Sequence, residues 1–158
     1  MHTPTPTPTP TASPLDLLSR LVVKDGVSLG GLSADELNLA LAWVWVGLPV
    51  GIVMNEPGIN AVLKAQLAGP AVWLHTDHVE LRRWLVDAGW LQRDGYGREY
   101  RRAAAAPYHA VPHHTALTDA MRGLDTTAWT AECRHARVAG RVARRQRWEQ
   151  QQARASTA

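Results

Sequence analysis

The sequence has a single cysteine, Cys133, and no long uninterrupted run of apolar residues. One cysteine permits no intramolecular disulfide, and the N-terminal residues offer neither the basic region nor the apolar region of a secretory signal. The longest nonpolar run, Leu39 to Met54, contains Gly47, Pro49 and Gly51, whereas a membrane helix needs about 20 uninterrupted apolar residues. We therefore expect a cytoplasmic protein that has no membrane partner.

Patterns for metal binding and catalysis are also scarce. Cys133 and His135 are two residues apart, and three histidines fall within residues 109–114, whereas a structural zinc site uses paired Cys/His motifs at defined spacing. No Ser/His/Asp set stands in the context of a nucleophile elbow, and the Gly-Tyr-Gly segment at 95–97 is too short to cradle a phosphate. We expect no metal, no cofactor and no catalytic residue, and hence a protein that is not an enzyme.

Charge is distributed unevenly along the chain, whose formal net charge is +3. Residues 1–79 carry 3 Lys/Arg and 6 Asp/Glu, a net of −3, whereas residues 80–158 carry 14 and 8, a net of +6. The basic half is where an anionic partner would bind. A general bias toward Ala and Arg would give the same composition, so charge alone does not identify that partner.

Composition divides the chain into five segments. Residues 1–14 alternate Thr and Pro, and because proline fixes φ and removes a donor, this segment is predicted to be a disordered tail. Residues 15–102 form one compact domain, and residues 103–114, which contain two prolines, form a linker. Residues 115–152 favour a basic C-terminal helix, and residues 153–158 form a second tail.

The domain is predicted to begin with three helices. Apolar residues at helical spacing predict a short first helix that ends before Asp25-Gly26. A second helix over 34–46 is indicated by the capping-box spacing of Ser33 and Glu36. Asn55 caps a third helix, with Pro57 in its first turn.

A fourth helix and a hairpin follow. Thr76 or Asp77 caps the helix, and its inward face consists of residues at helical spacing: Leu81, Trp84, Leu85 and Ala88. Gly89 is suited to end it in the left-handed conformation, and the glycines of 95–97 join two short strands. This order is expected of a winged helix-turn-helix. We therefore expect a mainly α fold with a small β-hairpin, which is a winged helix-turn-helix-like domain followed by a C-terminal helix.

The same region resembles a known family. The stretches "NEPGINAVL" (55–63) and "DHVELRRWLVDAGWLQRDGYGREYRR" (77–102) are similar to the bacterial domain of unknown function 2087, and the resemblance extends over about 15–102. In that family a helix of the form Leu-Arg-Arg-x-Leu-Val-Asp precedes an Arg-Asp-x-x-Gly-x-x-Tyr hairpin, which Arg93, Asp94, Gly97 and Tyr100 match here. Because the domain is often attached to MarR-like or ArsR-like winged-helix regulators, the resemblance implies a role in transcriptional regulation.

These features predict a surface for double-stranded DNA. Helix 77–88 would enter the major groove, where a guanidinium can bond guanine bidentately, and hairpin 90–102 would contact phosphates. The candidate DNA-binding residues are Thr76, His78, Arg82, Arg83, Arg93, Arg98, Arg101 and Arg102. The alternative is that Arg83 pairs with Glu80 or Asp87 on a solvated helix face, and that the hairpin is a plain solvated wing.

The C-terminal helix adds two further features. A secondary basic stripe consists of Arg134, Arg137, Arg141, Arg144 and Arg145, and it is either a solvated face or a nucleic-acid contact. A thin apolar seam consists of Met121, Leu124, Ala128, Ala131, Val138 and Val142. This seam would dock on the domain or on a second copy, which makes a homodimer possible.

The leading hypothesis is therefore a DNA-binding transcriptional regulator. The alternative is a non-enzymatic protein-interaction adaptor built on a winged-helix scaffold, with Trp84, Trp90 or the C-terminal helix as anchors. The acidic surface at 33–36 favours this alternative, because acidic side chains repel phosphate. The sequence identifies no operator, effector or regulated gene.

Overall fold

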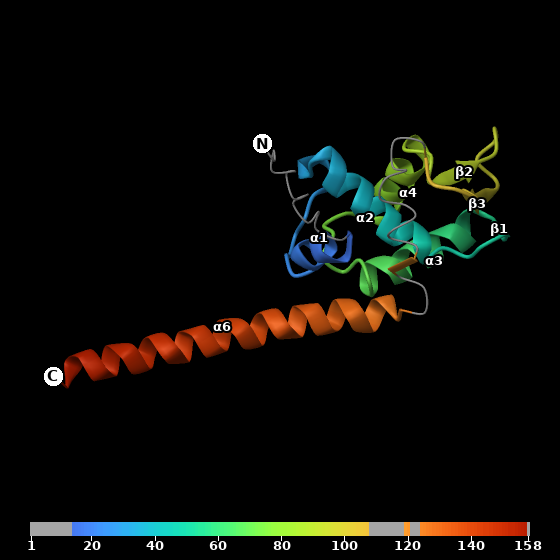
Figure 1. Ribbon diagram of the computed structural model, residues 1–158. Helices are drawn as coiled ribbons and strands as arrows, with labels where there is room; N and C mark the ends of the chain where they lie inside the picture. The colour runs from blue at the N-terminus through green and yellow to red at the C-terminus, as the bar shows by residue number, and fades with distance from the viewer. Residues whose placement is uncertain (1–13, 108–118, 121–123, 158) are drawn as a thin grey trace, which may run out of the picture.

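The computed structural model describes residues 14–107, 119–120 and 124–157. It is mainly helical, with a small antiparallel sheet (Figure 1). The elements in chain order are α1 (Pro14–Leu21), the 3₁₀ turn η1 (Leu29–Gly31), α2 (Ala34–Val46), β1 (Val53–Met54), α3 (Glu56–Ala68), α4 (His78–Asp87), β2 (Leu91–Arg93), β3 (Tyr100–Arg102) and α6 (Thr126–Ser156). The mainly α prediction is thus confirmed, and the arrangement is compatible with a winged-helix-like fold.

Helix α2 is the centre of the core. Every residue from Leu39 to Trp45 is buried, because helices and sheet pack around it. The predicted capping box is present, since the Ser33 hydroxyl accepts from the Glu36 amide at 3.2 Å and the Glu36 carboxylate accepts from the Ser33 amide at 3.1 Å. The indole N–H groups of Trp43 and Trp45 donate to the carbonyls of Pro70 and Ala103. These two bonds tie α2 to distant parts of the chain.

Helices α3 and α4 also start where capping residues predict. Asn55 accepts from the Gly58 amide, and Asp77, not Thr76, caps α4 by accepting from the Glu80 amide at 2.8 Å. Helix α4 buries Leu81 and Leu85 completely, and Gly89 follows it with a φ of 84°. This positive φ lets the chain turn from α4 into β2.

The sheet has three strands, in the order β1-β3-β2. Only the β2–β3 hairpin was expected, because β1 is two residues long and leaves no alternating pattern to detect. Alternation divides the sheet into two faces. Met54 and Tyr100 face the core, whereas Val53 and its cross-strand partner Arg101 face solvent.

Two predicted boundaries are corrected. Pro14 is the first residue of α1 rather than part of the tail, in agreement with the preference of proline for a first turn. Ala103, expected in the linker, is 4% exposed, and its amide donates to the Trp90 carbonyl. Residues 103–107 thus continue the domain, while residues 1–13 and 108–118 lie outside the described residues.

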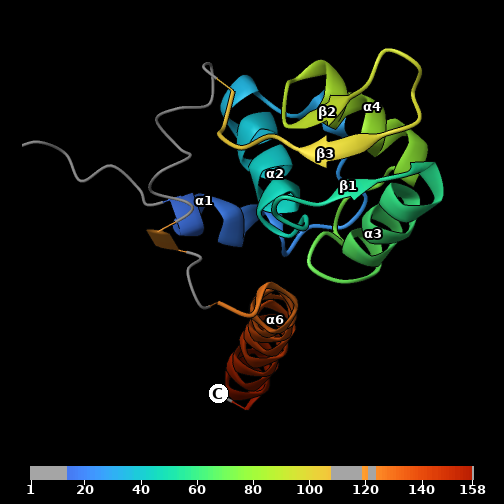
Figure 2. The ribbon, with the colours of Figure 1, turned by 90° about the vertical axis from the view of Figure 1, so that its right-hand side faces the viewer.

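Helix α6 differs from its predicted bounds at both ends. It begins at Thr126, where Asp125 accepts from the Ala128 amide, and it continues to Ser156, beyond the predicted end at 152. Its first turns pack on the domain, and Thr130 is buried. Beyond this contact the helix extends away from the domain (Figures 1 and 2).

Within the described ranges, none of the helices combines the length and the apolar character needed to cross a membrane.

Candidate nucleic-acid interface

The solvent face of α4 carries one of the predicted base-reading arginines. Because Leu81 and Leu85 point into the core, Glu80, Arg83 and Asp87 point outward, and all three are exposed. No ion pair between described residues joins Arg83 to Glu80 or Asp87. The alternative in which Arg83 is held by these carboxylates is therefore not the arrangement seen here.

The two polar candidates lie at the start of α4. Thr76 Oγ1 donates to Glu80 Oε2 at 3.0 Å, so this hydroxyl supports the first turn of the helix. His78 is the first residue of α4 and is partly buried. Both residues are close to the end of α4 that was expected to enter the groove.

Arg82 is held by other protein groups. Its Nη1 donates to Asn60 Oδ1 at 2.6 Å and lies 3.5 Å from Glu56 Oε1. Its guanidinium lies 5.3 Å from the centre of the Tyr100 ring, and 16% of its side chain is exposed. Because Arg82 follows the buried Leu81, one helical step turns it toward α3, and it joins α4 to α3 and β3.

Arg102 is also a contact within the fold. Its guanidinium lies 4.0 Å from the centre of the Trp45 ring, and Nη1 donates to the Leu48 carbonyl at 3.2 Å. Partial burial lowers the pKa of Arg102 through desolvation. Arg101 has the opposite orientation, since it pairs with Val53 and Gln92 on the outer face and is exposed.

The hairpin tip is organised by Asp94, whose Oδ1 accepts from the amides of Arg98 at 2.7 Å and Glu99 at 3.2 Å. Desolvation raises the pKa of this carboxyl, but the backbone N–H groups together outweigh it and hold the pKa below its usual value. Gly97 supplies the positive φ of the turn, and the Arg98 guanidinium lies 5.7 Å from the centre of the exposed Tyr96 ring.

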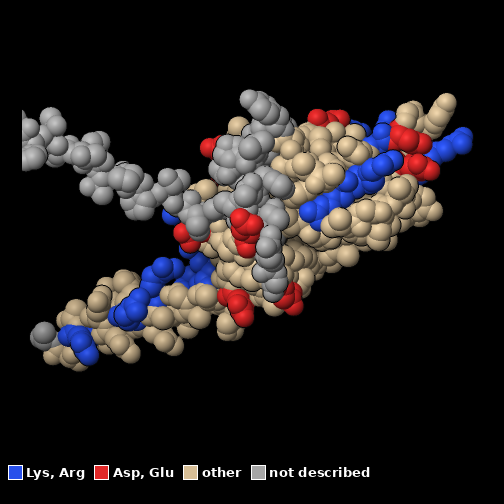
Figure 3. All heavy atoms as spheres, turned by 45° about the vertical axis from the view of Figure 1, so that its right-hand side comes forward, with Lys and Arg blue, Asp and Glu red and all other residues tan. Residues whose placement is uncertain are grey.

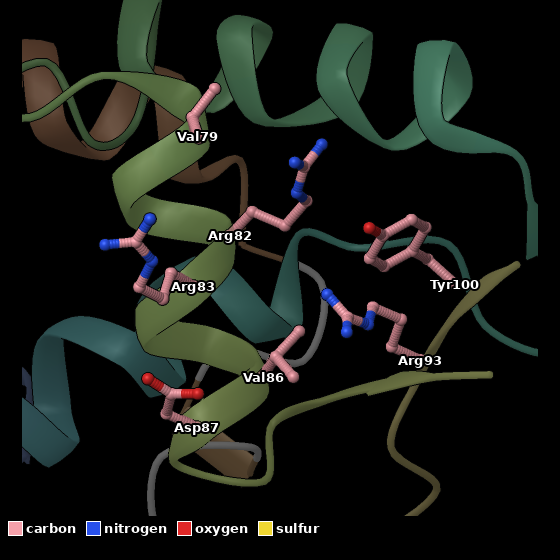
Figure 4. A pocket seen from close by; sticks show the side chains of 7 residues that line it. All are labelled: Val79, Arg82, Arg83, Val86, Asp87, Arg93 and Tyr100. Atoms are coloured by element: carbon pink, nitrogen blue, oxygen red, sulfur yellow. The ribbon is translucent and has the colours of Figure 1, made fainter. Parts of the chain in front are cut away.

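Four candidate residues are thus exposed on α4 and the hairpin, and we call them the arginine surface: Arg83, Arg93, Arg98 and Arg101. A cavity of about 150 Å³ opens between α4 and the hairpin. The residues that line it are Val79, Arg82, Arg83, Val86, Asp87, Arg93 and Tyr100 (Figure 4). Three of these seven residues are arginines and only one is acidic, so the lining favours an anionic ligand.

The secondary basic stripe divides in two. Arg134 donates to the carbonyls of Val22 and Lys24, each at 2.9 Å, and pairs with Asp25, so it fastens α6 to the end of α1. The other stripe residues are exposed: Arg137, Arg141, Arg144 and Arg145. Among them, Arg145 forms an ion pair on α6, since its Nε lies 3.7 Å from Glu149 Oε1. Figure 3 shows Lys and Arg gathered at the hairpin end of the domain and separately along α6.

The apolar seam of the C-terminal helix does not form one surface. Leu124 packs against the domain, whereas Val138 and Val142 are 57% and 49% exposed, and Met121 lies outside the described residues. Trp148, which was not singled out from the sequence, is 60% exposed. In the sequence, the position of Trp148 in an otherwise polar helical segment is the signal that could have identified it as an exposed aromatic residue.

One of the two predicted aromatic anchors, Trp90, is corrected. Trp90 is completely buried, and its ring centre lies 5.5 Å from that of Trp45. Trp84 is partly buried against the core. Trp90 therefore cannot insert into a partner in this conformation, whereas the partial exposure of Trp84 leaves its predicted role as an anchor untested.

Metal-ligating residues do not gather in the described ranges, where no three His, Cys, Asp or Glu side chains lie close enough to share an ion. Cys133 is partly buried, and desolvation, together with the charge of Glu132, raises the pKa of its thiol. The histidines of 109–114 lie outside the described residues.

Comparison with known proteins identifies one segment. No curated protein and no solved structure matches the chain. A family model matches from Ser33 to Arg102, which includes α2, the sheet, α3 and α4 but neither α1 nor α6. Over residues 33–102, the chain therefore matches the family described as an uncharacterized protein conserved in bacteria (DUF2087).

Proposed function

We propose that the protein is a DNA-binding transcriptional regulator that acts as a cytoplasmic, non-enzymatic winged-helix protein. The observation that carries this proposal is the arginine surface, which combines the exposed face of α4 with three exposed arginines of the hairpin. The order α2, β1, α3, α4 and hairpin supports it, since winged-helix proteins use the helix before the hairpin to enter the major groove.

The proposal gives the arginines different roles. Arg83 contacts base edges, while Arg93, Arg98 and Arg101 contact phosphates, which supply most of the affinity but little specificity. Arg82 and Arg102 position α4 and β3, because their guanidiniums are already engaged by Asn60 and by Trp45. Glu80 and Asp87 beside Arg83 limit the phosphate affinity of α4 itself, so the hairpin provides the stronger electrostatic contact.

Fluorescence anisotropy of labelled duplexes tests these roles. We expect Arg98→Ala and Arg101→Ala to weaken binding to all duplexes alike, and Arg83→Ala to reduce discrimination between sequences by about 1–3 kcal/mol. Arg137→Ala on α6 is the matched control and should bind as the wild type does. Equal affinity of all three variants and the wild type would exclude the arginine surface as the DNA contact.

A second candidate is the protein-interaction adaptor, and one observation favours it. The distal part of α6 exposes Trp148 together with Val138 and Val142, although exposed tryptophan is uncommon outside interfaces. The occupant of this surface would be a partner protein or a second copy of the chain. If Trp148→Ala abolishes partner capture while the wild type binds no duplex at low salt, the adaptor replaces the regulator as the better account.

A further inference from the structure

The cavity between α4 and the hairpin is lined by a tyrosine hydroxyl that has no hydrogen-bond partner among the described residues. Tyr100 is 3% exposed, and its hydroxyl points toward the space between α4 and β2 in Figure 4. Tyr100 Oη makes no hydrogen bond to a described residue, and it is not among the fully enclosed unpaired atoms, which are Gln66 Oε1 and Trp90 Nε1. The hydroxyl therefore opens into the cavity, where a ligand can accept its hydrogen bond, and a buried phenol normally has such a partner.

Two guanidiniums face the same space. Arg93 is the cross-strand partner of Tyr100, so their side chains lie next to each other on one face of the hairpin. Arg82 extends from α4 on the side of the sheet, whereas Arg83 and Asp87 project from the other side of the helix (Figure 4). The hydrogen-bond donors that face the space between α4 and the sheet are consequently those of Arg82, Arg93 and Tyr100.

Arg82 is held in place before any ligand binds. Asn60 and Glu56 both contact its Nη1, and neither described bond uses Nη2 or Nε. The stacked Tyr100 ring fixes the plane of the guanidinium further. A guanidinium already fixed in this way loses little conformational entropy when its remaining donors bind a ligand.

The chemistry of the cavity selects a phosphoryl oxyanion. The guanidiniums and the phenol offer donors, which match the several acceptor oxygens of a phosphate group. The Asp87 carboxylate in the lining and Glu56 beside Arg82 reduce the net positive charge around the cavity. The charge stays positive, because the lining also contains Arg83 and Arg93. The cavity volume of about 150 Å³ corresponds to roughly five water molecules, which is space for one phosphate group.

We infer that this cavity is a phosphate-binding site formed by Arg82, Arg93 and the hydroxyl of Tyr100. The phosphate belongs either to a DNA backbone or to a free phosphorylated compound, and the first case rests on the proposed function. The site shares Arg93 with the hairpin contacts described above but not Arg101, which faces the opposite side of the sheet.

The first experiment titrates inorganic phosphate at constant ionic strength and follows the arginine Nε–H signals by NMR. Saturable binding is expected in the wild type, with affinity lowered about tenfold in Tyr100→Phe, which retains the ring but loses one charge-assisted hydrogen bond. Arg93→Gln should bind at least as weakly as Tyr100→Phe. Arg137→Gln, on the exposed part of α6, is the control and should match the wild type.

Two results would overturn the site: no saturable change in the wild type, or equal affinity in Tyr100→Phe and Arg137→Gln. Melting temperatures without phosphate should be equal for the wild type and Tyr100→Phe, because the hydroxyl has no described protein partner to lose. A large destabilisation of Tyr100→Phe would instead assign the hydroxyl to the fold and also reject the inference.

Duplex binding by the same variants separates the two sources of phosphate. A backbone phosphate predicts that Tyr100→Phe weakens duplex binding and that inorganic phosphate competes with DNA. A free compound predicts that Tyr100→Phe loses phosphate affinity and leaves duplex affinity unchanged. Phosphate binding by a wild type that binds no duplex would reject the regulator while supporting the site.

Discussion

Adjacent arginines of the hairpin have opposite roles. Arg101 and Arg102 are consecutive in β3, so alternation places one outside and one against the core. Arg102 stacks on Trp45 and donates to the Leu48 carbonyl, whereas Arg101 is exposed. Only a residue such as Arg101 can contribute its charge to a partner without disturbing the domain.

This difference predicts opposite effects on stability. Arg102→Ala should lower the free energy of unfolding by about 2 kcal/mol, because it removes the cation–π contact and the carbonyl bond. Arg101→Ala should change it by less than about 0.5 kcal/mol, as is usual for exposed positions. Denaturation in urea measures both, and equal destabilisation would show that Arg102 is not an internal contact.

The Asp94 carboxylate makes the hairpin tip sensitive to acid. Its pKa is below the usual value of 3.8, so its contribution to the folded tip is present above that pH and is lost as the pH falls through the lower, folded-state value. An NMR titration of the Arg98 and Glu99 amides should therefore show a midpoint below 3.8. A midpoint at or above that value would show that these amides do not stabilise the charged carboxylate.

At the scale of elements, α6 is attached through its first turns. The Pro70 carbonyl accepts from Trp43 at 2.9 Å and from Trp73 and Thr130 at 3.0 Å each. The rings of Trp43 and Trp129 are 5.1 Å apart, and Arg134 binds the carbonyl end of α1. These contacts join α6 to α1, α2 and the segment before α4.

The attachment of α6 should depend on Arg134. Arg134→Ala should raise amide exchange in the first turns of α6 and lower stability by about 2 kcal/mol, because the variant leaves carbonyls at the end of α1 without a charged donor. Arg137→Ala, one turn further along the exposed helix, should change neither. Unaltered exchange in Arg134→Ala would mean that Trp129 and Thr130 hold the helix without Arg134.

The elements differ in how far the sequence predicts them. Helices α2, α3 and α4 follow from their caps and apolar spacing, since Ser33, Asn55 and Asp77 act locally. Strand β1 is not predicted from the sequence, because it exists only through its pairing with β3. The start of α6 is not predicted either, because residue 125, which caps the helix, lies inside an Ala- and Arg-rich stretch.

The candidate site is predicted only in part, for a similar reason. Sequence identifies the arginines as a group, but Arg82 and Arg102 are engaged by Asn60 and Trp45, which are distant in the chain. Strand alternation indicates that 101 and 102 face opposite ways. Which of them faces inward depends on the pairing of Leu91 with Arg102, which a single sequence does not determine.

At the scale of the molecule, two basic regions lie apart. The hairpin is at one end of the domain, and α6 leaves from the side of α1, away from the sheet (Figures 1 and 2). One short stretch of duplex that contacts the hairpin would therefore not also run along α6. The exposed part of α6 is available for a different contact, and the homodimer expected from the sequence would form there.

Truncation separates these two roles. Removing residues 137–158 should leave the domain folded, because Thr130 and Arg134 remain, and should leave duplex affinity of the monomer within about a factor of two. The wild type should form dimers that the truncated chain does not form, as measured by light scattering. A monomeric wild type, or a dimeric truncated chain, would remove α6 from any role in pairing.

The measurement that tests the central claim most directly is the salt dependence of duplex affinity for the wild type and for the triple variant Arg93→Ala, Arg98→Ala, Arg101→Ala. Each phosphate contact contributes about 0.9 to the slope of log affinity against log salt, so the variant should lose roughly 3 units of slope. An unchanged slope, or a wild type that binds no duplex at low salt, would contradict DNA binding through the hairpin.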